Sequence, residues 1–61
     1  MDYKKMRELR EAAGMTQEEF AKKIEVDQSM ISLIEKGRRR VSAELLFNIA
    51  DALGVKADDL R

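Results

Sequence analysis

Residues 14–37 of the chain read GMTQEEFAKKIEVDQSMISLIEKG, and this stretch decides the fold. Thr16 precedes Glu19 by three residues, which is the spacing at which a hydroxyl and a carboxylate cap each other's backbone amides at a helix start. The apolar residues that follow recur at helical spacing along one face. The pattern predicts a short helix over residues 17–24.

A second short helix is expected directly after the first. Asp27 is a favourable N-cap residue, and Gly37 can adopt the left-handed conformation at which helices often end. These two signals bound a helix over residues 28–36. Only residues 25–27 separate the two helices, and this connection is too short for antiparallel stacking. The two helices should therefore cross steeply.

The rest of the chain is also predicted to be helical, with helices over residues 3–13 and 43–53 and a short last one over residues 57–60. The chain has no proline and no alternating β-branched stretch that would indicate strands. We expect an all-α, compact five-helix fold that forms a single domain over residues 1–61. The side chains expected to face its core are Met6, Leu9, Ala13, Phe20, Ala21, Ile24, Val26, Ile31, Ile34, Leu46, Phe47, Ile49, Ala50, Leu53 and Leu60.

Composition excludes several classes of function. The chain has no cysteine and no histidine, so it can form no disulfide, no thiolate or imidazole metal site and no Ser-His or Cys-His nucleophile. We therefore expect no enzymatic activity, no metal, no cofactor and no small-molecule substrate. No apolar run approaches the roughly 20 residues that cross a bilayer, and the charged N-terminus is unlike a signal peptide. A cytoplasmic protein without a membrane partner is the expectation.

Charge is unevenly distributed although it sums to zero. Twelve basic and twelve acidic residues cancel, which argues against a protein that coats nucleic acid by charge alone. Residues 28–40, however, hold four basic residues and one acidic residue. Two short helices that cross steeply have helix-turn-helix geometry, which serves to place the second helix in the major groove of DNA.

The sequence resembles the helix-turn-helix family of phage repressors and Cro proteins, also called the XRE family. The matching blocks, which span nearly the whole chain, are Leu9-Arg10, Gly14 to Ala21, Gln28 to Gly37 and Leu46 to Val55. The resemblance implies a lambda-repressor-like five-helix domain in which the second and third helices form the helix-turn-helix. It also implies a sequence-specific regulator of transcription, a repressor that binds a two-fold-symmetric operator of double-stranded DNA as a homodimer.

Four side chains point away from the apolar face of the helix over residues 28–36 and are candidates to read bases: Gln28, Ser29, Ser32 and Leu33. Gln28 is the strongest candidate, because its amide can pair with the N6 and N7 edge of adenine. The serine hydroxyls can bond to bases or phosphates, and Leu33 can touch a thymine methyl group. Alternatively, Gln28 and Ser29 are ordinary residues of a first helical turn.

Seven residues are candidates to contact the DNA backbone: Gln17, Lys36, Arg38, Arg39, Arg40, Arg10 and Asn48. The basic run follows the recognition-like helix, and Gln17 opens the preceding helix, where free amides favour an anion and the resembling family grips phosphate. The resemblance also implies an ion pair between Arg10 and Glu35 that can orient Arg10 toward phosphate. The alternatives are a solvated basic surface and an ordinary surface ion pair.

Two departures from the family bear on the expected geometry. Glu25 stands where the family often has glycine, and a left-handed backbone there would cost about 1–2 kcal/mol. Arg40 and Val41 stand where a proline or an asparagine is common, so the path of the loop before Ser42 is open.

Other functions of the same fold stay open. Leu45 and Val55 indicate a dimer surface at the end of the molecule formed by the last two helices, although Leu45 could instead fill a gap beneath the recognition-like helix. The zero net charge leaves room for a protein-interaction module that has lost DNA binding. An antitoxin that also binds a toxin is a further possibility.

Overall fold

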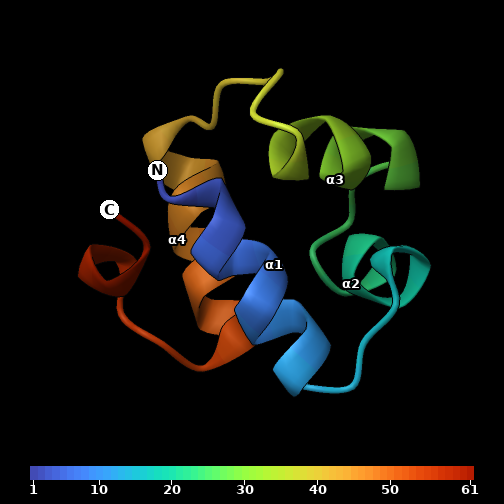
Figure 1. The fold of residues 1–61 in the computed structure, drawn as a ribbon, viewed down its shortest axis with the longest axis horizontal. Helices are drawn as coiled ribbons and strands as arrows, with labels where there is room; N and C mark the ends of the chain where they lie inside the picture. The colour runs from blue at the N-terminus through green and yellow to red at the C-terminus, as the bar shows by residue number, and fades with distance from the viewer.

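The chain forms four α-helices and one short 3-10 helix, in a computed structural model that describes residues 1–61. In chain order the elements are α1 (Tyr3–Ala12), α2 (Gln17–Lys23), α3 (Gln28–Glu35), α4 (Ala43–Leu53) and η1 (Ala57–Leu60) (Figure 1). The all-helical expectation is confirmed, and each predicted boundary holds to within one residue. None of the helices is both long enough and apolar enough to cross a membrane.

The prediction of a fifth α-helix is wrong. Residues 57–60 form a single 3-10 turn, in which the Asp59 amide donates to the Lys56 carbonyl at 2.9 Å and the Arg61 amide donates to the Asp58 carbonyl at 3.3 Å. These bonds join residues three apart, which is the tighter hydrogen-bonding pattern that short helical segments adopt. The turn still contributes to the core through Leu60, which is fully buried.

Side chains cap the starts of α2 and α4 but not the start of α3. Thr16 Oγ1 accepts from the Glu19 amide at 3.0 Å while Glu19 Oε1 accepts from the Thr16 amide at 2.9 Å. The backbone hydrogen bond from Thr16 lowers the pKa of the Glu19 carboxyl. Ser42 Oγ accepts from the Leu45 amide at 3.2 Å. Asp27 occupies the N-cap position of α3 but makes no side-chain cap; its backbone carbonyl accepts from the amides of Met30 and Ile31.

The core is a single cluster to which every element contributes. Its fully or nearly buried members are Met6, Phe20, Ala21, Ile24, Ile31, Ile34, Ile49, Ala50 and Leu60. The predicted core residues Leu9, Val26, Leu46 and Leu53 are half-buried and pack against it. Two predictions are wrong, because Ala13 is exposed just beyond α1 and Phe47 is 64% exposed. Phe47 shares the outer face of α4 with Asp51, four residues on, while Ile49 and Ala50 face inward.

The helices divide into two groups that place α3 at the edge of the molecule. Figure 1 shows α2 and α3 side by side at one end, with α1 and α4 beside them and η1 on the far side. The two chain ends meet, since the Asp2 amide donates to the carbonyl of Leu60. The arrangement leaves one long face of α3 uncovered by other elements, because Ile31 and Ile34 hold its opposite face in the core.

The turn between α2 and α3 keeps the left-handed backbone despite its glutamate. Glu25 has a φ of 60° and is the only residue other than glycine with a positive φ. The Val26 amide reaches back to the Ala21 carbonyl at 2.9 Å and the Glu25 amide to the Lys22 carbonyl at 3.3 Å. This pair of bonds is the Schellman ending of a helix, in which the left-handed position usually carries glycine. The Cβ of Glu25 therefore strains the turn.

We expect Glu25→Gly to raise the free energy of unfolding by about 0.5–1 kcal/mol. Glycine removes the strain of the left-handed backbone, but it also increases the conformational entropy of the unfolded chain, which offsets part of this gain. Urea denaturation measures the change. Glu8→Gly is the matched control: this exposed glutamate lies inside α1 with ordinary helical geometry, and glycine there should cost about 1 kcal/mol. A loss of stability in Glu25→Gly would contradict the strain.

Candidate nucleic-acid interface

The outer face of α3 presents the side chains that the sequence nominated for reading bases. These are Gln28, Ser29, Ser32 and Leu33, of which Ser32 is half-buried and the others are exposed. Their positions, one and four residues apart, form one stripe along the helix. On the opposite face, Ile31 and Ile34 are no more than 1% exposed. The stripe therefore projects from a helix whose rotation and position are held by the core.

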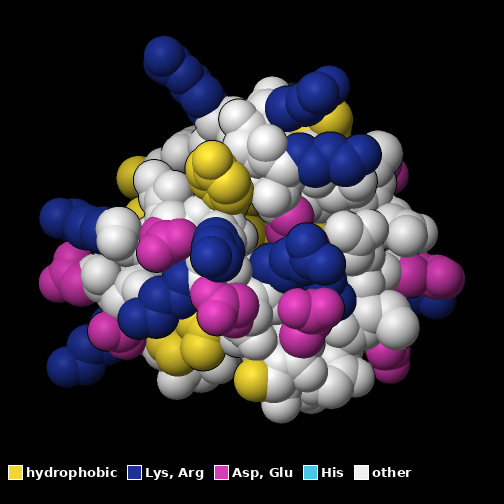
Figure 2. Space-filling model, in the orientation of Figure 1, with side chains coloured by type: hydrophobic (Ala, Val, Ile, Leu, Met, Phe, Trp, Pro, Cys, Tyr) yellow, Lys and Arg dark blue, Asp and Glu magenta, His cyan; other side chains and the backbone are white.

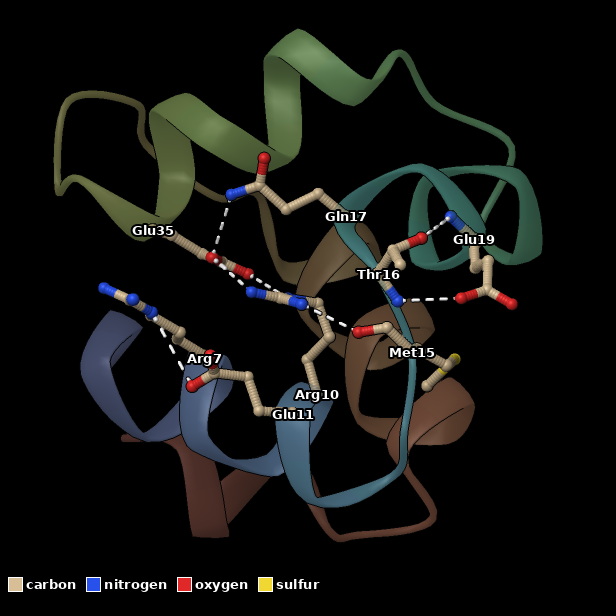
Figure 3. A network of polar contacts seen from close by, with 8 residues as sticks. All are labelled: Arg7, Arg10, Glu11, Met15, Thr16, Gln17, Glu19 and Glu35. Atoms are coloured by element: carbon tan, nitrogen blue, oxygen red, sulfur yellow. Dashed lines mark hydrogen bonds and ion pairs between the residues drawn. The ribbon is translucent and has the colours of Figure 1, made fainter.

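A buried ion pair ties α3 to α1. Arg10 Nε donates to Glu35 Oε2 at 2.7 Å and Arg10 Nη2 donates to Glu35 Oε1 at 3.1 Å (Figure 3). The two side chains are 9% and 4% exposed, so the predicted pair is confirmed and it is not a surface pair. The hydrogen bond to Glu35 raises the pKa of Arg10. Two parallel bonds of this kind give planar specificity as well as attraction.

The same pair also holds the start of α2. Arg10 Nη1 donates to the backbone carbonyl of Met15 at 2.7 Å. Gln17, the first residue of α2, donates from Nε2 to Glu35 Oε1 at 3.1 Å (Figure 3). No buried side-chain nitrogen or oxygen lacks a hydrogen-bond partner. Three helices are thus joined by one guanidinium and one carboxylate.

The basic run leaves α3 at its carboxyl end. Lys36 and the three arginines at 38–40 are all exposed, and Figure 2 shows Lys and Arg side chains projecting around the α3–α4 loop that Figure 1 draws at the top. Gly37 has a φ of 71° and the Arg38 amide donates to the Leu33 carbonyl at 2.9 Å. A Cβ on Gly37 would lie 2.7 Å from a ring carbon of Tyr3, so the aromatic ring sits directly on the backbone at the start of the run.

Asn48 lies apart from this basic run. It is exposed on α4 and lines two open grooves between α4 and the α2–α3 turn. Glu25 borders both grooves, and Asp51 borders one of them. Carboxylates at these positions disfavour a phosphate, whereas Lys23, which borders one of the grooves, favours it, so the backbone contact by Asn48 stays a prediction.

The geometry of α2 and α3 accords with the comparison to known proteins. The family described as "Helix-turn-helix" matches residues 6–60. The chain belongs to the helix-turn-helix family. It is 39% identical over 57 residues to the HTH-type transcriptional regulator YazB of Bacillus subtilis, an alignment covering 93% of this chain and 83% of YazB.

Two further relatives of this helix-turn-helix chain are control proteins. The control protein C.MunI of a Mycoplasma species is 39% identical over 57 residues, which cover 92% of this chain and 77% of C.MunI. The crystal structure of the restriction-modification controller protein C.AhdI from Aeromonas hydrophila superimposes with a TM-score of 0.92 at 34% identity. That superposition covers 97% of this chain and 89% of C.AhdI.

Two features of the site were missed by reasoning from the sequence. The hydrogen bond between Gln17 and Glu35 joins residues 18 apart in the chain, and no local pattern indicates it. The exposure of Phe47 was missed because this residue adjoins the apolar positions of α4. Its spacing of four residues from Asp51 is the signal that could have placed it on the outer face.

We expect Arg10→Met to lower the free energy of unfolding by about 3–5 kcal/mol, because it leaves the Glu35 carboxylate buried without its charged partner. Replacing both residues in Arg10→Met/Glu35→Met should restore most of that loss, since two apolar side chains leave no buried charge. Thermal and urea denaturation measure both variants.

The control for this prediction is Arg7→Met. Arg7 pairs with Glu11 at 3.7 Å, but the two side chains are 61% and 55% exposed, so its removal should change stability by less than about 1 kcal/mol. Equal losses in Arg7→Met and Arg10→Met would show that burial of the Arg10–Glu35 pair has no energetic consequence.

Proposed function

We propose that this chain, a DNA-binding transcriptional regulator of the helix-turn-helix family, is a sequence-specific repressor that binds a two-fold-symmetric operator as a homodimer. The observation that carries the proposal is the free outer stripe of α3, held rigid from beneath and followed directly by exposed arginines. Base edges and flanking phosphates of one major groove are what such an arrangement can contact together. The names of the regulator and control-protein relatives support it.

Base recognition is assigned to the stripe on α3. Gln28 stands at the amino end of the helix, where an exposed amide can both donate to and accept from one adenine. Ser29 and Ser32 offer hydroxyls that bond to bases or phosphates, and Leu33, 41% exposed, offers an apolar surface to a thymine methyl group. A bidentate amide pair of this kind discriminates against a wrong base by about 1–3 kcal/mol.

Backbone contact is assigned to the exposed cations and to one amide. Lys36 and the arginines at 38–40 follow the stripe, and their charge is unpaired by any acidic side chain within 4 Å. Gln17 joins them through its side-chain amide. Arg10 is left out because its guanidinium is buried and bonded to Glu35 and Met15. Asn48 is left out because the two grooves that it lines hold three carboxylates and one lysine.

The homodimer is assigned to the face formed by α4 and η1. Phe47 is 64% exposed and lines a shallow pocket whose other apolar members are Ala50, Val55 and Ala57. The rim of the pocket carries two basic and two acidic side chains, namely Lys56, Arg61, Asp51 and Asp58. A two-fold axis brings such a patch against itself, so that the apolar centres stack and each charge can meet its opposite.

Leu45 does not belong to this dimer face. It is half-buried and lines a separate groove together with Val26 and Met30. This placement favours the alternative in which Leu45 fills space beneath α3, and it moves the proposed contact from Leu45 to Phe47 and Val55. Two α3 helices related by the resulting two-fold axis would read half-sites about one helical turn, roughly 34 Å, apart.

We expect Gln28→Ala and Arg38→Ala to weaken binding in different ways. Gln28→Ala should relax preference at one base position by about 1–3 kcal/mol and leave the salt dependence unchanged. Arg38→Ala should weaken binding to all sequences alike and flatten the slope of log affinity against log salt by about one unit. Fluorescence anisotropy on duplexes selected from a random pool, and on their single-base variants, measures both.

Two outcomes would contradict these assignments. Equal weakening of every operator variant by Gln28→Ala would remove its role in reading bases. Absence of duplex binding by the unaltered chain at low salt would remove the DNA-binding function and leave a protein-interaction module.

We expect Phe47→Lys to convert the dimer to a monomer and to lower operator affinity, because a charge at the centre of the patch meets its own copy across the two-fold axis. Sedimentation equilibrium measures the association. Leu33→Lys is the matched control, since this exposed apolar side chain lies on α3 and should leave the oligomeric state unchanged. A dimer that persists in Phe47→Lys would place the interface elsewhere.

A further inference from the structure

We propose that Glu35 is a positioning residue for DNA: its carboxylate holds the side-chain amide of Gln17 so that the second amide hydrogen donates to a phosphate. The inference rests on the proposed function and adds to it a residue that need not touch DNA. The contact of Gln17 with the DNA backbone then depends on the hydrogen bonds among Arg10, Glu35 and Gln17, and not on Gln17 alone.

The geometry places one oxygen of Glu35 between two donors. Glu35 Oε1 accepts from Arg10 Nη2 and from Gln17 Nε2, both at 3.1 Å, while its other oxygen accepts Arg10 Nε at 2.7 Å (Figure 3). The Glu35 side chain is 4% exposed, and its carboxylate accepts all three of these hydrogen bonds. Gln17 is half-buried, with its amide held at one edge by this fixed carboxylate.

Hydrogen-bond chemistry decides which end of the amide is held. A carboxylate only accepts, so it can bond to the NH₂ group of Gln17 and not to the carbonyl oxygen. The NH₂ group has two hydrogens, and one remains free for a second acceptor. A phosphate oxygen is also only an acceptor, so a freely rotating glutamine could present its carbonyl oxygen and be repelled. The hydrogen bond to Glu35 excludes that orientation. It also restricts the rotamers of the long Gln17 side chain before DNA binds, so that less conformational entropy is lost on binding.

Charge explains why a carboxylate can stand behind a phosphate contact. An unpaired carboxylate here would repel the DNA backbone, but the bidentate Arg10 guanidinium cancels its charge. Arg10 also holds the carbonyl of Met15, two residues before Gln17. The Arg10–Glu35 pair therefore holds both the backbone that leads into α2 and the side chain of Gln17.

As a consequence, the base contacts of α3 and the phosphate contact of Gln17 are coupled through Glu35. Glu35 is the last residue of α3, which carries the base-reading stripe, and Gln17 is the first residue of α2. Because the carboxylate joins them directly, the phosphate contact sets the depth and register of α3 in the groove. Loss of the link should weaken binding to all sequences without altering which base is preferred.

Nuclear magnetic resonance on the unaltered chain provides the first test. The two side-chain amide protons of Gln17, assigned by their absence in Gln17→Met, are followed in ¹⁵N-labelled protein with and without a duplex selected from a random pool. We expect one proton, bonded to Glu35, to keep its shift while the other moves when duplex is added. Movement of neither proton, or of both, would overturn the inference.

A mutant cycle provides the second test. Gln17→Met removes the donor at constant size, and Arg10→Met/Glu35→Met removes the anchor while leaving no buried charge; thermal melts confirm that each variant is folded. We expect each to lower affinity about tenfold and the triple variant to lose no more than about tenfold, because both changes remove one contact. A hundredfold loss in the triple variant would mean that Glu35 and Gln17 act independently.

The controls separate this inference from the proposed function. Arg38→Ala combined with Arg10→Met/Glu35→Met should give multiplied losses, because the two sites share no partner. If the unaltered chain binds no duplex at low salt, the proposed function fails. If it binds and discriminates bases but the cycle with Gln17→Met is multiplicative, only the role of Glu35 fails.

Discussion

The hydrogen-bonded pair of Arg10 and Glu35 is the interaction on which the rest of the structure depends. It is almost fully buried, and its remaining bonds go to Met15 and Gln17, so that α1, the entry to α2 and the end of α3 share one reference point. A buried pair is costly to desolvate, and removing one partner leaves an uncompensated buried charge. Through its bonds to Met15 and Gln17, this pair fixes the start of α2 relative to the end of α3.

Helix α3 has two different faces. Ile31 and Ile34 bury one face completely, and the polar stripe beginning at Gln28 occupies the other. A small domain has little apolar surface to spare, so an eight-residue helix with only two fully buried side chains needs further support. Glu35 at its carboxyl end and the Tyr3 ring against Gly37 supply that support without covering the outer face.

Much of the fold follows from interactions between residues close together in the chain. The capping box of Thr16 and Glu19 joins groups three residues apart, and its pattern is readable directly. The left-handed ending at Glu25 was considered only through family resemblance, because glutamate does not favour that backbone. The pairing of Arg10 with Glu35 was anticipated only through family resemblance, because 25 residues separate the two. The missing side-chain cap at Asp27 shows that a favourable residue type does not decide a rotamer.

The sequence by itself determined an all-helical chain, its helix boundaries and the stripe of side chains that begins at Gln28. Those features rest on periodicity and on hydrogen bonds between near neighbours, which the order of residues dictates. Only the tertiary structure decided that Arg10 is buried, that Gln17 bonds to Glu35 and that Phe47 faces outward. The physical reason is that these outcomes depend on how one helix surface meets another, and such contacts join residues that the chain keeps far apart.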